Sequence, residues 1–154
     1  MPEATPTLHE WAGGDVVLLR LTQVFYERVR EDPVLAPLFA EMPHDHPQHV
    51  ATWLAEVFGG PRRYTEAHGG YPHMLAKHRG RALTESQRRR WLDLMLDAAD
   101  AAGLPDDPEF RSAFVAYLEW GTRLALANSQ PGAAPAPEAP VPRWGWGEAP
   151  PYVP

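Results

Sequence analysis

The stretch Phe58-Gly59-Gly60-Pro61-Arg62-Arg63-Tyr64, the later segment Tyr71-Pro72-His73-Met74-Leu75-Ala76-Lys77-His78 and Trp91 together decide the fold of this chain. A complete apolar helical stripe leads into them, made of Val50, Trp53, Leu54, Val57 and Phe58. The Gly-Gly-Pro sequence ends this helix, because proline cannot continue a helix and glycine favours its C-terminal cap. Residues 61–83 hold three more glycines and a second proline, so we expect only a short helix around Met74–Lys77, with His78 in a loop.

Helical signals also frame the rest of the chain, so an all-α fold is predicted. Asp15 is a plausible N-cap for a helix that runs toward Arg30, and a short helical segment is expected over Val34–Phe39. Thr84 to Gln87 form a capping box for a helix that Gly103 ends, and Asp107-Pro108 begins the last one.

The chain is predicted to hold one domain with two flanking segments. Residues 1–14 are expected to form a loose lead-in, and residues 15–129 the helical domain. Residues 130–154 form a Pro-rich tail, expected to be extended or disordered by composition. Because Trp144 and Trp146 are unusual in such a tail, we expect them to dock either on the domain or on a partner.

Composition excludes several classes of function. A net charge of −6 over 154 residues argues against nucleic-acid or anionic-membrane binding, which needs a clustered basic face. The one basic run, Arg88-Arg89-Arg90, is interpreted as a solvated helix face. The lack of cysteine excludes disulfides and thiolate-bound metals. With no secretory leader and no apolar run long enough to span a bilayer, a soluble cytoplasmic protein is expected.

A second group of histidines, His44-Asp45-His46 with His49, has three interpretations. Imidazoles and a carboxylate bind zinc, so a zinc hydrolase is one of them. The group directly precedes the helix with Pro47 in its first turn, so these side chains could also face water. The third interpretation, a role beside a bound ligand, depends on a family resemblance.

That resemblance rests on His78, on Trp91 thirteen residues later, and on Phe25-Tyr26 and Phe39 upstream. Taken alone, a loop histidine is usually an exposed polar residue. In this context the pattern resembles the group II truncated haemoglobins, over roughly residues 16–128. The resemblance implies a shortened globin with its helices in a two-over-two sandwich and bound haem b, which needs an axial imidazole and aromatic walls.

The resemblance also implies roles for individual residues. His78 is the axial ligand, with its second ring nitrogen donating to a backbone carbonyl. Tyr26 and Trp91 are hydrogen-bond donors to the bound ligand, and His46 lies near the distal gate. The expected haem contacts, for most of which plain core packing is the alternative, are Phe39, Val50, Trp53, Leu54, Phe58, Arg63, Tyr64, Met74, Lys77, Arg81 and Met95.

The leading functional hypothesis is therefore a haem protein that binds oxygen, carbon monoxide or nitric oxide. Nitric oxide oxidation or peroxide reduction is compatible with polar donors beside iron, and sustained turnover would then need an outside electron donor. Two rivals stay open on the sequence: a haem-free helical interaction module with the tryptophan tail as its ligand, and the zinc hydrolase.

Overall fold

The computed structural model describes residues 4–134 and 139–147. Within these residues the chain is all-helical, as predicted. The helices are α1 (Leu8–Ala12), α2 (Asp15–Glu31), the 3-10 helix η1 (Ala36–Phe39), α3 (His46–Val57), α4 (Arg63–His68), α5 (Tyr71–His78), α6 (Glu85–Ala101) and α7 (Pro108–Asn128).

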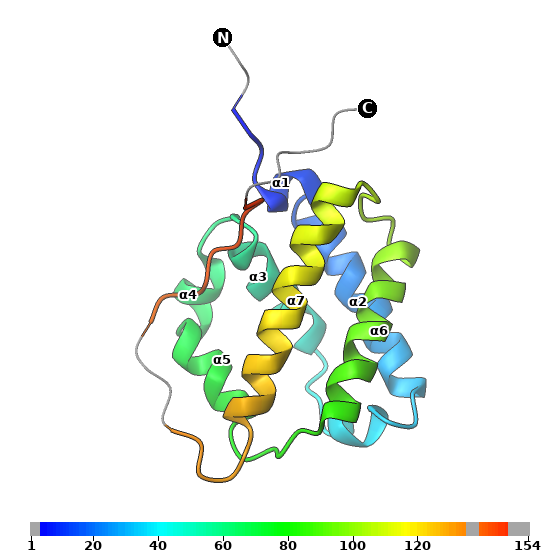
Figure 1. The fold of residues 1–154 in the computed structure, drawn as a ribbon, viewed down its shortest axis with the longest axis vertical. Coiled ribbons are helices and arrows are strands. Elements are labelled where there is room, and N and C mark those ends of the chain that lie inside the picture. Colours follow the sequence, from blue (N-terminus) through cyan, green and yellow to red (C-terminus); the bar gives the residue numbers. More distant parts are fainter. Residues whose placement is uncertain (1–3, 135–138, 148–154) are drawn as a thin grey trace.

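Four long helices form two packed pairs. Helix α2 packs against α3 and α6, and α6 packs against α7 (Figure 1). Their facing apolar stripes make one core, in which Leu18, Phe25, Met95 and Phe114 are fully buried. This arrangement is the expected two-over-two sandwich. Among the described residues, no helix combines the length and the apolarity that crossing a membrane requires.

The lead-in differs from the expectation of a loose segment. Thr7 caps helix α1 by accepting a hydrogen bond from the Glu10 amide at 3.0 Å, and Leu8 is buried. The Trp11 indole donates to Asp107 at the start of α7, at 2.8 Å. The T-x-x-E spacing from Thr7 to Glu10 is typical of a helix start, but the helix that it begins has only five residues.

The segment after Gly60 is more helical than predicted. It contains α4 and α5, and His78 is the last residue of α5 rather than part of a loop. Gly70 takes the positive φ of 75° that reverses the chain between the two helices, a conformation open to glycine. Pro72 lies in the first turn of α5, where its missing N–H costs no intrahelical hydrogen bond. Both residues that suggested a loop therefore begin a helix.

The caps of the last two helices are as predicted. Thr84 and Gln87 form the reciprocal capping box of α6. Asp107 accepts a hydrogen bond from the Phe110 amide at 2.9 Å and begins α7. The start of α2 differs by one residue: Gly14 is the N-cap, and Asp15 instead accepts a hydrogen bond from His9 and pairs with Arg63.

The basic run Arg88-Arg89-Arg90 is only partly a solvated face. The Arg88 side chain is buried and donates to Glu85 and, across the helix pair, to Glu119 of α7. Arg90 pairs with the buried carboxylate of Asp32 after α2 at 2.6 Å. Only Arg89 is strongly exposed, as expected for the whole run. The run thus ties α6 to its neighbours, because long side chains can bury their stems while pairing their charged ends.

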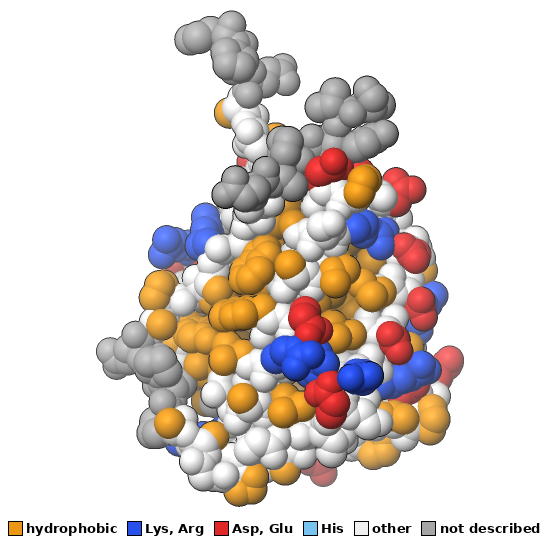
Figure 2. Space-filling model, in the orientation of Figure 1, with side chains coloured by type: hydrophobic (Ala, Val, Ile, Leu, Met, Phe, Trp, Pro, Cys, Tyr) orange, Lys and Arg blue, Asp and Glu red, His pale blue; other side chains and the backbone are white. Residues whose placement is uncertain are grey.

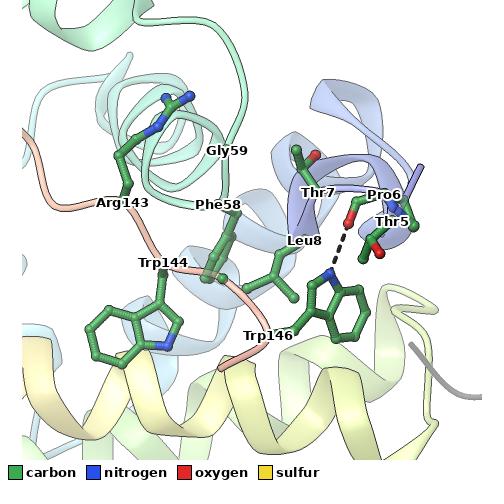
Figure 3. Close-up of a pocket in the computed structure, with 10 residues that line it drawn as sticks. Thr5, Pro6, Thr7, Leu8, Phe58, Gly59, Arg143, Trp144 and Trp146 are labelled. Carbon is green, nitrogen blue, oxygen red and sulfur yellow. Dashed lines mark hydrogen bonds between the residues drawn. The ribbon is translucent and has the colours of Figure 1, made fainter. Parts of the chain in front are cut away.

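Residues 139–147, here called the strap, lie against the domain. The Trp144 amide donates to the carbonyl of Val57 at 2.7 Å, and Arg143 donates to the carbonyl of Gly60 at 2.8 Å. The Trp146 indole reaches the carbonyl of Pro6 at 2.8 Å, beside α1 (Figure 3). Both tryptophans of the strap therefore lie on the domain, and residues 139–147 form no helix or strand.

Candidate functional site

His78 is held in one orientation by its own helix. Its Nδ1 lies 3.0 Å from the backbone carbonyl of Met74, one turn earlier in α5. A carbonyl can only accept, so Nδ1 carries the proton and Nε2 keeps its lone pair. Burial lowers the pKa of His78, which favours the neutral ring. A neutral imidazole with a free Nε2 is the form that binds a metal.

A second polar group lies at the junction of α2 and α3. The Tyr26 hydroxyl is 3.0 Å from Nε2 of His46, and the two rings meet edge to face with centroids 4.9 Å apart. Phe39 of η1 packs near both rings, with its centroid 5.6 Å from Tyr26 and 6.2 Å from His46. Tyr26 is only 3% exposed, and its burial raises the pKa of the hydroxyl, so the phenol keeps its proton.

Electrostatics place His46 and the end of α5 around one region. The pKa of His46 is lowered to about 4, first by burial and then by the positive charges of Lys77, His49, Arg81 and His78. Three of these four charges come from α5 or the residues just after it. The end of α5 therefore lies near enough to the start of α3 for its charges to act on His46, whose ring itself turns to Tyr26.

Trp91 joins this region from α6. It is half-buried, and its ring meets Phe25 at 5.0 Å, while Phe25 in turn packs on Tyr26 at 4.8 Å. The two predicted donors therefore share one aromatic neighbour on α2. In the sequence, Phe25 was only part of the family pattern. Its complete burial against Tyr26 and Trp91 makes it the residue that positions both rings.

The predicted wall residues divide into two groups. Trp53, Leu54 and Met95 are buried, while Val50 and Met74 are half-buried against the core. Phe58 instead packs on Phe114 and Tyr117, with centroids at 5.9 and 5.4 Å. For Phe58, the alternative of plain core packing is the one that these contacts favour.

Tyr64 carries a buried hydroxyl that the described residues leave unpaired. The residue is 1% exposed, and its hydroxyl has no hydrogen-bond partner among the described residues. A neighbour, Thr65, fixes this turn of α4 by donating its amide to the buried Glu56 carboxylate at 2.9 Å. Because buried hydroxyls are rarely left unpaired, this atom is suited to an acceptor that the chain itself does not supply.

The predicted cationic partners of the haem carboxylates lie in different places. Lys77 and Arg81 stay together at the end of α5, where the Arg81 guanidinium donates to the Lys77 carbonyl at 2.6 Å. Arg63 is exposed and pairs with Asp15 of α2. The expected place of Arg63 at a haem edge therefore has no support in these contacts.

The histidine cluster does not assemble as a metal site. Within the part of the chain that the structure describes, no three His, Cys, Asp or Glu side chains are placed to hold a metal ion. His46 turns to Tyr26, and His49 pairs with Asp45 at 3.2 Å. The ring of His49 lies 4.3 Å from that of His68, a residue that sequence reasoning missed because it follows the glycine-rich stop.

The two packed helix pairs, with the short helix α5 against α7, have the arrangement of a shortened globin. The bacterial-like globin family model matches residues 7–120. A group 2 truncated hemoglobin of Bacillus subtilis is 34% identical over 117 residues, which cover 76% of this chain and 86% of that protein.

Known structures agree. The group II truncated hemoglobin from Bacillus anthracis has a TM-score of 0.74 at 25% identity, covering 84% of this chain and 98% of its own. The truncated oxygen-avid haemoglobin from Bacillus subtilis has a TM-score of 0.70 at 31% identity, covering 79% and 99%. This chain belongs to the bacterial-like globins, as a group II truncated haemoglobin.

The depressed pKa of His46 predicts an acid-sensitive fold. A histidine whose pKa falls from 6.5 to about 4 on folding binds fewer protons folded than unfolded across that window. Its contribution is complete above pH 6.5 and is lost progressively as the pH falls toward 4. In His46→Gln, which keeps a polar side chain beside Tyr26, the free energy of unfolding should fall less over this range.

Urea titrations of the chain without added hemin, at a series of pH values, measure this difference. His44→Gln is the matched control, because His44 is exposed and directly precedes the same helix. If the two variants lose stability with acid in parallel, His46 is not the responsible group.

Proposed function

We propose that this chain binds haem b beside α5, with Nε2 of His78 as the axial ligand, and holds diatomic ligands on the Tyr26 side. The main observation in support of this proposal is the hydrogen bond from His78 Nδ1 to the Met74 carbonyl, which leaves Nε2 free to bind a metal. Membership of a family of truncated haemoglobins supports the proposal, as does the relative described as oxygen-avid.

The residues present suit haem beyond the axial ligand. The unpaired Tyr64 hydroxyl can donate to a haem carboxylate, and Lys77 with Arg81 supplies positive charge at the end of α5. When bound, haem supplies an iron centre that takes oxygen, carbon monoxide or nitric oxide and that peroxide can oxidise. The chain's own residues then orient the ligand and shield it from water.

On the distal side, the Tyr26–His46 pair controls where a proton points. At neutral pH His46 is uncharged, so its Nε2 either donates to Tyr26 or accepts from it. When Nε2–H donates, the Tyr26 hydroxyl proton is free to point at a polarised diatomic ligand. The indole of Trp91 can only donate, so it suits the same ligand. These two donors favour retention of oxygen.

Other assignments remain part of this proposal. Nitric oxide oxidation and peroxide reduction are both compatible with donors beside the ligand, with electrons coming from an outside donor. Location in the cytoplasm is proposed on the sequence alone. The rival interpretation as a haem-free interaction module is not favoured, because the chain belongs to the truncated haemoglobins.

Replacing the axial ligand is the primary test. The purified chain reconstituted with hemin should show a strong Soret band, and His78→Ala should lose most of it, because the axial imidazole is removed. His73→Ala is the matched control, an exposed histidine on the same helix. Retention of the full band by His78→Ala, or its loss in His73→Ala, would show that His78 is not the ligand.

The Tyr64 hydroxyl should slow the loss of haem. A net hydrogen bond contributes about 0.5–1.5 kcal/mol, so Tyr64→Phe should release haem to excess apomyoglobin about two- to tenfold faster. Arg63→Gln is the control. It changes the residue directly before Tyr64 and removes the ion pair with Asp15, and it should leave the rate of haem loss unchanged. Equal rates for the wild type and Tyr64→Phe would remove Tyr64 from carboxylate binding.

The Trp91 indole should slow the release of oxygen. Trp91→Phe keeps a ring against Phe25 but removes the donor, so release should be several-fold to about tenfold faster, with ligand entry changed less. Stopped-flow displacement of oxygen by carbon monoxide measures both rates. Trp11→Phe, on α1, is the control. An unchanged release rate would mean that the indole does not reach the ligand.

A further inference from the structure

Three aromatic rings meet where the strap crosses α7. Trp144 lies 5.6 Å from Tyr117 and 5.5 Å from Trp120, as measured between ring centroids. Tyr117 and Trp120 are themselves 6.3 Å apart. Trp120 is 40% exposed, Trp144 is half-buried and Tyr117 is 6% exposed, so the group leads from solvent into the core.

The same group continues inward without a break. Trp53 of α3 donates its indole N–H to the Tyr117 hydroxyl at 2.7 Å. On its other side Trp53 meets Tyr64 edge to face at 5.1 Å and lies nearly parallel to Tyr71, at 6.3 Å and 14°. Tyr64 carries the unpaired hydroxyl, and Tyr71 begins the helix that ends at His78.

Tryptophan and tyrosine are the side chains that lose a single electron most readily, and transfer between such rings slows steeply as the gap between them widens. A run of rings in near contact is therefore a conducting route, whereas isolated rings are not. We propose that Trp53, bridged by Tyr117, passes oxidising equivalents from the haem site to Trp144 and Trp120 at the surface. This inference rests on the proposed haem function.

The reaction balances with peroxide as oxidant and a phenol as reductant. Reduction of one hydrogen peroxide to two water molecules takes two electrons and two protons. Each of two phenol molecules gives up one electron and one proton at the surface rings and leaves as a phenoxyl radical. Each tryptophan on the route loses one electron and regains it from its outer neighbour. Without a phenol, a surface tryptophan is consumed: peroxide and tryptophan give hydroxytryptophan and water.

The outer end of the route suits an aromatic reductant. A hollow beside Trp144 is lined by Ala113 and Ala116 of α7 together with Glu109 and Ser112, so small apolar side chains border the outer rings. Figure 2 shows hydrophobic side chains gathered along α7 on the side of the strap, whereas charged side chains lie mainly toward α6. A neutral phenol can contact this surface without losing the hydration of a charge.

The structure also provides an internal comparison. Trp11 and Trp146 form a second pair at 5.7 Å, and both are half-buried. Trp146 is only two residues from Trp144 on the strap, but its indole turns toward α1 and Pro6 (Figure 3). Among the described residues, no ring contact joins this pair to Trp144 or Tyr117.

The test maps oxidised tryptophans after one equivalent of hydrogen peroxide is added to ferric, haem-loaded protein without reductant. Peptide mass spectrometry should find hydroxytryptophan at Trp120 and Trp144 at least several-fold more than at Trp11 and Trp146. The haem-free chain, treated in the same way, measures how much each tryptophan is oxidised because of its solvent exposure alone. In Trp53→Phe, normalised to haem content by the Soret band, the preference should disappear. Tyr117→Leu, which removes the bridging ring away from the proposed haem contacts, should also abolish it.

The outcomes separate this inference from the proposed function. A protein that takes up no hemin contradicts the haem function itself. If haem binds and reacts with peroxide, equal oxidation of the two tryptophan pairs overturns the route. A preference that survives in both Trp53→Phe and Tyr117→Leu overturns it as well. Suppression of the labelling at Trp120 and Trp144 by added phenol, with formation of its oxidised dimer, supports the surface end of the route.

Discussion

The hydrogen bond from the His78 ring to the Met74 carbonyl is the interaction on which the proposed site depends. It fixes the tautomer and the direction of the imidazole at once. It can form only because α5 continues as a helix to its last residue, which places the carbonyl of residue 74 one turn below residue 78. The glycine and proline at the start of α5 are therefore part of the site, although they lie two turns from it.

The charges around His46 give a second reason to expect an anionic group in this region. Lys77 and Arg81 both lower the pKa of His46, so two positive charges lie close to this imidazole. Such a grouping disfavours the bare protein through mutual repulsion. The two carboxylates of haem would relieve it and would also pair with the Tyr64 hydroxyl. Cofactor binding and the fold would then stabilise each other through the same residues.

Features that neighbouring residues determine could be predicted from the sequence, whereas features that depend on residues far apart along the chain could not. The capping box at Thr84 and the stripe ending at Phe58 are local, and both are present as predicted. The length of α5 was underestimated, because Gly70 and Pro72 were counted as helix breakers although their positions begin the helix. The burial of Arg88 depends on Glu119, thirty-one residues away, and no local pattern indicates it.

The strap shows why the tail could not be placed from composition. The last carbonyls of α3 have no partner within their own helix. Here the Trp144 amide donates to the carbonyl of Val57, and the Arg143 guanidinium donates to the carbonyl of Glu56 and to that of Gly60 just beyond the helix. A cation at this end also suits the negative pole of the helix. An extended, proline-rich backbone has no internal hydrogen bonds to lose, so its donors are free to complete a distant helix end. The strap is thus a cap for α3, and its Trp144 extends the aromatic core outward from Tyr117.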